Sequence, residues 1–134
     1  MNMYVLDTDT CIYSLKGESR IRKKVEQVGA DSLRTTIITL AELKYGAYYS
    51  QKAKENLENI AGFLRKVKVL PLDYDGAERF GKIKAELRRS GRVLQDFDLL
   101  IASITLSHAG TLVTNNVEHF KRINGLSCEN WLQE

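Results

Sequence analysis

A short apolar run that ends abruptly at an acid, near the start of the chain, most constrains the fold. Tyr4, Val5 and Leu6 are typical of a buried strand, Asp7 follows at once, and residues 8–17 have a helical pattern. A strand that leads directly into a helix is typical of parallel α/β sheets, which keep their ligands at the carboxyl ends of the strands. An Asp at such a junction is also a common helix N-cap, and for Asp7 alone the cap is favoured.

Strands and helices are expected to alternate along the rest of the chain. Residues 33–38, 67–72 and 111–114 have the composition of strands. Apolar residues recur at helical spacing between and after them, and the expected helices are residues 18–29, 39–49, 53–66, 75–90, 98–109 and 115–123. This alternation predicts an α/β fold, a three-layer α/β/α domain around a mostly parallel sheet of four to five strands.

The whole chain, residues 1–134, is expected to form one domain, since 43% hydrophobic residues suffice for one core and only one Pro interrupts the sequence. The tail around Leu126 and Trp131 either adds an edge strand or packs across the domain. No apolar run approaches the roughly 18 residues of a membrane span, and no signal peptide is recognisable, so we expect a cytoplasmic protein. Cys11 and Cys128 are expected to be free thiols.

Glu42 occupies a position with two interpretations. It shares a helical stripe with Ile38, Tyr45 and Tyr49, which predicts that it points with apolar side chains. It also stands three residues after Thr39, the spacing of a capping box, and Asp75 and Glu78 repeat that spacing. The stretch itself favours neither interpretation.

Asp98 opens the most apolar helix expected in the chain, two residues after Asp96. Its simplest interpretation is a first-turn acid behind an Asp96 N-cap, and Asp9 likewise is expected to be a surface acid. Taken together, however, Asp7, Glu42 and Asp98 follow or precede strands in a way that gathers them at one sheet edge. Gathered carboxylates repel one another unless a cation compensates, and oxygen ligands without a His or Cys cluster favour Mg²⁺ or Mn²⁺ over zinc.

The loop after the strand at 111–114 adds a hydroxyl and two amides to the same edge, from Thr114, Asn115 and Asn116. Asn is also a common turn residue, so this loop alone is as well explained by structure as by function.

The sequence resembles PIN-domain ribonucleases, and most closely the VapC toxins of bacterial toxin–antitoxin pairs. The matching segments are Val5-Leu6-Asp7-Thr8, Thr39-Leu40-Ala41-Glu42 with Tyr45-Gly46, Gly91-Arg92, Asp98-Leu99-Leu100-Ile101-Ala102, Leu112-Val113-Thr114-Asn115-Asn116 with Phe120, and Glu129-Asn130-Trp131. Each segment is weakly specific, but their order and spacing together cover nearly the whole chain.

The resemblance implies that Asp7, Glu42 and Asp98 are the acidic ligands of Mg²⁺ or Mn²⁺ in an RNA-cleaving enzyme. It further implies a transfer RNA substrate, a homodimer and a VapB antitoxin whose C-terminal segment covers the active site. Asn116 stands where many relatives carry a fourth acid, with Glu118 and His119 close by. Thr8, Asp96, Thr114, Asn115 and Asn116 are therefore expected in supporting or phosphate-positioning roles.

RNA must reach the acids despite its own charge, so basic groups should flank them. The net charge of +3 permits a polyanionic partner. The candidates are Arg88, Arg89 and Arg92, with Arg20, Arg22, Lys23 and Lys24 as a second patch, although solvated helix faces explain each residue equally simply. Tyr48 or Tyr49 could stack on bases but more often such residues pack in a core or interface, and structural roles are expected for His108, His119 and Trp131.

Two other classes of function remain open. A catalytically silent PIN-fold module that binds only RNA or protein is compatible with the missing fourth acid, and it would cleave nothing at any ion concentration. A phosphate-accepting or phosphatase-like protein built on Asp7 and Asp9 would leave a covalent phospho-aspartate, and it would give Glu42 no part.

Overall fold

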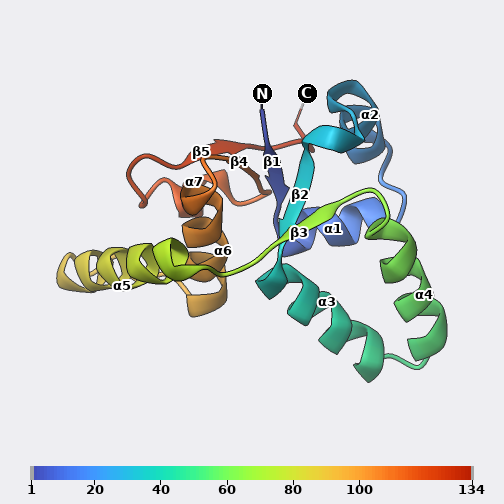
Figure 1. The fold of residues 1–134 in the computed structure, drawn as a ribbon, viewed down its shortest axis with the longest axis horizontal. Coiled ribbons are helices and arrows are strands. Elements are labelled where there is room, and N and C mark those ends of the chain that lie inside the picture. Colours follow the sequence, from blue (N-terminus) through green and yellow to red (C-terminus); the bar gives the residue numbers. More distant parts are fainter. Residues whose placement is uncertain (1, 134) are drawn as a thin grey trace.

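A computed structural model describes residues 2–133, in which five strands form one entirely parallel sheet. The strands are β1 (Tyr4–Leu6), β2 (Leu33–Thr36), β3 (Lys68–Leu70), β4 (Thr111–Val113) and β5 (Ser127–Glu129), in the spatial order β3-β2-β1-β4-β5. The register pairs Val5 with Arg34 on one side and with Leu112 on the other. The apolar N-terminal strand is therefore the centre of the sheet (Figure 1).

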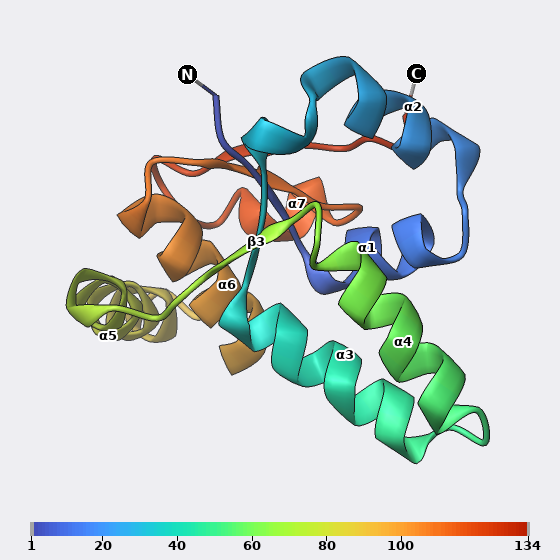
Figure 2. The same ribbon diagram turned by 45° about the vertical axis from the view of Figure 1, so that its right-hand side comes forward.

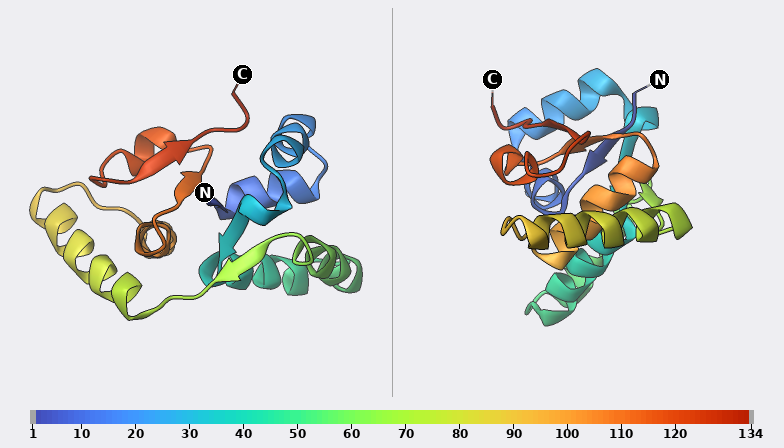
Figure 3. Two further views of the ribbon diagram at one scale, coloured as in Figure 1. Left: turned by 45° about the horizontal axis from the view of Figure 1, so that its top comes forward. Right: turned by 90° about the vertical axis from the view of Figure 1, so that its left-hand side faces the viewer.

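Helices connect the strands and cover both faces of the sheet, as predicted. They are α1 (Thr8–Leu15), α2 (Ser19–Val28), α3 (Ile37–Tyr49), α4 (Ala53–Phe63), α5 (Tyr74–Arg89), α6 (Asp96–Ser107) and α7 (Val117–Phe120), with a 3-10 turn at Ala30–Ser32. In the left view of Figure 3, α5 and α6 lie on one side of the strands and α1, α2 and α4 on the other. Figure 2 shows α3 and α4 as an antiparallel pair.

Alternation along the strands divides the core between the two faces. Val5 and Leu112 belong to the core under α5 and α6, whereas their neighbours Leu6 and Val113 belong to the core under α1 to α4. α6 lies deep in the first core, as its apolar sequence predicts. Burial on both faces explains why β1 and β4 read as continuous apolar runs.

Two helices begin earlier than predicted because a different residue caps each. Thr36 caps α3 by accepting a hydrogen bond from Thr39 N at 3.1 Å, so the predicted strand 33–38 ends at Thr36. Asp73 caps α5, accepting from Gly76 N at 2.7 Å. The capping boxes predicted at Thr39 and Asp75 are therefore wrong.

The remaining boundaries differ from prediction at helix ends. α6 begins at Asp96 behind Gln95, so the prediction of an Asp96 N-cap is wrong. The Asp96 carboxylate instead accepts from Lys84 Nζ of α5 at 2.8 Å. The tail forms the edge strand β5, and α7 is shorter than the predicted helix 115–123. Within residues 2–133, no helix is long and apolar enough to span a membrane.

Candidate active site

Asp7 ends the central strand and is held by the start of α1. Its Oδ1 accepts a hydrogen bond from Thr10 N at 2.9 Å, so the predicted cap is present, and the residue is only 7% exposed. Burial raises its pKa to about 6, against hydrogen bonds from Thr114 and Thr10 that lower it and with repulsion from Asp9. Among the described residues no cationic side chain lies within ion-pair distance of this carboxylate.

Glu42 points from the second turn of α3 toward the junction of β1 and α1. Thr8 Oγ1 donates to Glu42 Oε1 at 2.6 Å and lies 3.2 Å from Thr39 Oγ1. Glu42 is half-buried, whereas Tyr45 and Tyr49 of its expected stripe are 68% and 82% exposed. Neither sequence interpretation of Glu42 is therefore correct, because its partner is a hydroxyl from the strand-to-helix turn beside Asp7.

Asp98 lies in the first turn of α6, whose beginning is next to the beginning of α3 (Figure 1). Partial burial raises its pKa, while the nearby His119, with Nε2 3.7 Å from Asp98 Oδ2, lowers it. Repulsion from Asp9 raises the pKa of Asp98 as it raises that of Asp7. The exposed Asp9, predicted as a surface acid, is thus electrostatically coupled to both.

We call Asp7, Thr8, Glu42 and Asp98 the acidic corner. Three elements distant in sequence bring these residues to the carboxyl edge of the sheet, at the starts of α1, α3 and α6. The loop after β4 adds Thr114, which is buried and accepts from Asn116 N at 3.0 Å.

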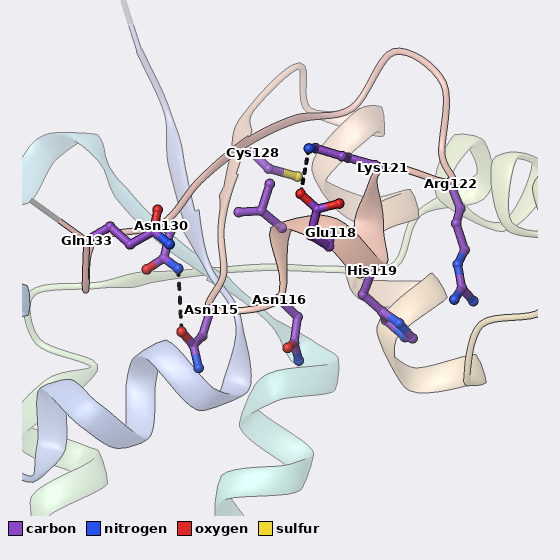
Figure 4. A pocket seen from close by; sticks show the side chains of 10 residues that line it. Asn115, Asn116, Glu118, His119, Lys121, Arg122, Cys128, Asn130 and Gln133 are labelled. Carbon is purple, nitrogen blue, oxygen red and sulfur yellow. Dashed lines mark hydrogen bonds and ion pairs between the residues drawn. The ribbon is translucent and has the colours of Figure 1, made fainter.

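Asn115 and Asn116 are exposed beyond Thr114. Asn115 Oδ1 lies 3.4 Å from Asn130 Nδ2, and Asn116 is the residue before α7. Figure 4 shows that the side chains of Asn115 and Asn116 point toward the ribbons of α1 and α3, whereas His119 points toward α6, which carries Asp98. This polar loop therefore borders the acidic corner.

His119 is a neighbour of the site that the sequence assigned to a structural role. The available signal was its position three residues after Asn116, which puts both on one side of the short helix α7. The structural roles expected for His108 and Trp131 are confirmed: His108 Nδ1 lies 3.0 Å from Ile104 O, and Trp131 is buried against Tyr4.

Arg88, Arg89 and Arg92 are exposed in and just after the last turn of α5. Asp96 is tied to α5 by Lys84. A role for these four residues toward RNA or toward the acids stays a prediction. Tyr48 and Tyr49 are also exposed, which excludes a place in the core of this chain.

The donor atoms of the acidic corner are carboxylate, hydroxyl and amide oxygens, the kind that Mg²⁺ and Mn²⁺ prefer. Asp7 is buried without a counter-charge, so its ionised form fits a cation. Among residues 2–133, however, no three His, Cys, Asp or Glu side chains surround one point closely enough to hold an ion as they stand. The residues therefore have suitable ligand atoms for the ion. Each carboxylate is held by its own contact, Asp7 by Thr10, Glu42 by Thr8 and Asp98 by His119.

The family model described as PIN domain matches residues 4–126, over the central strand, the acidic corner and the loop after β4. The chain belongs to the PIN-domain family. Within that family, its relatives include the tRNA(fMet)-specific endonuclease VapC of Shigella flexneri, 37% identical, with 98% of this chain and 99% of the relative covered. Ribonuclease VapC2 of Rickettsia felis is 34% identical, with 96% and 98% covered.

Solved structures of VapBC complexes contain chains with the same fold as this PIN domain. DNA-bound VapBC from Salmonella typhimurium contains a chain with a TM-score of 0.92 and 36% identity, with 98% of this chain and 99% of that chain covered. VapBC2 from Rickettsia felis bound to a promoter DNA fragment matches with a TM-score of 0.91 and 33% identity, with 96% and 98% covered. The predicted three-layer fold and the resemblance to VapC are confirmed.

Proposed function

We propose that this PIN domain is a metal-dependent endoribonuclease toxin that hydrolyses phosphodiester bonds of transfer RNA and is inhibited by a VapB-type antitoxin. The observation that carries the proposal is the buried, uncompensated Asp7 with the hydrogen-bonded pair Thr8 and Glu42 beside it. The similarity to the tRNA(fMet)-specific endonuclease VapC of Shigella flexneri supports the reaction and the RNA class, and the similarity to ribonuclease VapC2 of Rickettsia felis supports the reaction.

Asp7, Glu42 and Asp98 are the residues that would hold a divalent cation. When bound, Mg²⁺ or Mn²⁺ supplies an activated water at neutral pH and charge neutralisation at the phosphate. Asp7 is kept in place by Thr10 N, and Glu42 by the hydroxyl of Thr8, so two carboxylates are oriented before RNA arrives. No side-chain nucleophile is required.

The loop after β4 supplies neutral hydrogen-bonding groups where the substrate phosphate enters. Thr114 supports Asp7, and Asn115 and Asn116 present amides that donate to phosphate oxygens without adding negative charge. Asn116 takes the place of an additional acid, so the corner repels RNA less than a four-acid site would. Arg88, Arg89 and Arg92 are candidate phosphate contacts on the side of α5.

Two protein partners complete the proposal. The solved VapBC assemblies support an antitoxin as the regulatory partner. A second copy of this chain is expected to dimerise through the exposed tyrosines of α3 together with α4.

The decisive experiment incubates the purified protein with transfer RNA in Mg²⁺, in Mn²⁺ and with excess chelator. We expect discrete cleavage products with either ion and none with chelator. An Asp98→Asn variant with unchanged circular dichroism and Tm should lose cleavage, because the ion and the charge pattern of the corner depend on that carboxylate.

Cleavage that persists in chelator would contradict the metal-dependent mechanism. Saturable RNA binding without cleavage at any Mg²⁺ or Mn²⁺ concentration would instead identify a catalytically silent RNA-binding module. A covalent phospho-aspartate at Asp7, detected by mass spectrometry, would identify phosphoryl transfer.

A further inference from the structure

A polar hollow lies directly beside the acidic corner, between the loop after β4, α7 and the chain after β5 (Figure 4). Its volume is about 740 Å³, and we call it the amide hollow because four amide side chains line it. They are Asn115, Asn116, Asn130 and Gln133. Amides present both donors and acceptors, which is the chemistry that pairs with the edges of unstacked bases.

The amide hollow begins at the acidic corner. His119 lines it and has its Nε2 3.7 Å from Asp98 Oδ2. Lys121 and Arg122 line it as well, and Arg122 is held by a hydrogen bond to Val93 O at 2.7 Å. Glu118 also lines the hollow and accepts from Lys121 Nζ at 2.7 Å, so Arg122 is the cation of this hollow that no acid neutralises among the described residues. An RNA strand with a phosphate at the acidic corner would therefore enter a hollow with amides for its bases and Arg122 for a phosphate.

A second hollow of about 430 Å³ continues from the far end of the amide hollow, and Gln133 lines both. We call it the basic hollow, because Arg20, Lys23 and Lys24 of α2 line it and, within residues 2–133, no acid lines it. Glu18 accepts from Arg20 Nε at 2.9 Å, so Lys23 and Lys24 are the cations offered to a phosphate. Arg20 Nη1 donates to Leu132 O at 2.7 Å, which fixes the chain after β5 against α2. The two hollows thus adjoin at Gln133, beside a backbone segment that is held in place.

The α5 side of the corner has a different charge pattern. Arg89 lines a hollow on α5 together with Glu78, Lys82 and Glu86. Two acids beside the cations reduce the attraction for a polyphosphate. Among residues 2–133, no acid forms an ion pair with Lys23 or Lys24 of the basic hollow, whereas two acids lie beside Arg89 on α5, so the basic hollow is the better electrostatic continuation.

We propose that single-stranded RNA on one side of the scissile phosphate runs through the amide hollow and over Gln133. Its outer phosphates bind Lys23 and Lys24 in the basic hollow. The inference rests on the proposed function, which places the cleaved phosphate at the acidic corner. It assigns the path of the RNA to the side of the site formed by the loop after β4 and the chain after β5. Base contacts lie in the amide hollow and phosphate contacts on α2.

The test measures binding in excess chelator, so that it does not depend on cleavage. The probe is a fluorescently labelled single-stranded RNA of random sequence and about 12 nucleotides, a length that grooves of this kind cover. Titrations of the full chain at several salt concentrations give the Kd and the salt slope. The variants are Lys23→Gln with Lys24→Gln and, to test the candidate phosphate contacts on the other side of the site, Arg88→Gln with Arg89→Gln. The matched control is Lys66→Gln with Lys68→Gln, which removes two exposed cations at the edge strand β3, on the opposite edge of the sheet from β5.

We expect the α2 double variant to bind about ten-fold more weakly, with a salt slope reduced by about 1.4, because each phosphate contact on single strands contributes about 0.7. The control should leave both quantities unchanged, and the α5 double variant should change them less than the α2 double variant does, because two acids lie beside Arg89. Gln133→Ala should weaken binding by about three-fold with no change in salt slope, since a neutral amide releases no counterion. Unchanged circular dichroism and Tm confirm that each variant folds.

An α2 variant that binds RNA like the parent overturns the inference, and so does a loss of binding confined to the α5 variant. If the α2 variant binds RNA normally but loses its complex with an antitoxin, the basic hollow serves a protein and not RNA. Failure of the proposed function is distinguishable: RNA binding would still depend on Lys23 and Lys24, while no ion would support cleavage.

Discussion

The two ends of α3 contrast in what they bury and what they expose. At the N-terminal end Thr36 and Thr39 are fully buried and Glu42 is half-buried, each with a hydrogen-bond partner. At the C-terminal end Tyr45 and Tyr49 are exposed and stack on each other, with ring centroids 5.8 Å apart. A helix in an ordinary core would show the reverse distribution.

Each end of α3 departs from the usual pattern of buried apolar and exposed polar side chains, and the reason differs between the two ends. The polar end lies beside Asp7, whose burial makes its ionised form costly, and a cation would offset that cost. The aromatic end carries apolar surface that stays in water until another molecule covers it. Chemistry is thus expected at one end of the helix and association at the other.

The largest expected effect is on cleavage when Glu42 of the polar end loses its charge. Glu42→Gln should lower kcat/KM by several hundred-fold, which is a loss of about 3 to 4 kcal/mol of transition-state stabilisation. The reason is that a neutral amide cannot balance the charge of a bound cation. Initial rates of transfer RNA cleavage measure the loss. Glu55→Gln, which removes an exposed acid from the neighbouring α4, should cleave like the parent. If Glu42→Gln cleaves as fast as the parent, the Glu42 carboxylate takes no part in cleavage.

The second effect is on stability. The pKa of Asp7 is raised from 3.8 to about 6 in the folded protein, so ionisation favours the unfolded chain. Without metal, the contribution of Asp7 to the free energy of unfolding should be most favourable below about pH 4, where its carboxyl group is protonated in both states. This contribution should fall as the pH rises toward 6. Asp7→Asn should therefore stabilise the chelated protein at neutral pH by about 2 to 3 kcal/mol, while abolishing cleavage.

Urea unfolding at pH 4 and pH 7.5, with and without Mg²⁺, measures this effect. The gain from Asp7→Asn should vanish at the lower pH and shrink when Mg²⁺ is present. A variant less stable than the parent at pH 7.5 in chelator would show that Asp7 is held as a favourable cap and not as a strained charge.

A smaller effect is expected from the hydroxyl that orients Glu42. Thr8→Val keeps the shape of the side chain but removes the donor at 2.6 Å, which should lower kcat/KM by about 10-fold. Thr8→Ser restores the hydroxyl and should recover most of the rate. A Val variant as active as the Ser variant would mean that Glu42 needs no orienting partner.

The smallest effect on the folded monomer is expected at the aromatic end. Tyr45→Ala with Tyr49→Ala should change monomer stability by no more than about 0.5 kcal/mol, because both rings are largely exposed. The same change should shift the dimer toward monomer in light scattering at micromolar concentration. A dimer that persists unchanged would place the association surface elsewhere.

Local pattern predicted the layers of this fold because strand and helix periods depend on neighbouring residues. The apolar run at Tyr4 to Leu6 and the alternating elements sufficed for a parallel three-layer domain. Caps were harder, since Thr36 and Thr39, or Asp73 and Asp75, are equally suitable residues a few positions apart. The end of the preceding strand selects between them.

The sequence by itself determined which carboxylates belong at one sheet edge, because a parallel sheet brings the ends of β1 and β2 and the start of α6 together. Only the tertiary structure decided what each carboxylate touches. Thr8 reaches Glu42 across 34 residues, His119 approaches Asp98 from α7, and the chain after β5 joins α2 through Arg20 and Leu132. Such contacts depend on how layers pack, and no local period or spacing records the relative placement of elements far apart in the chain.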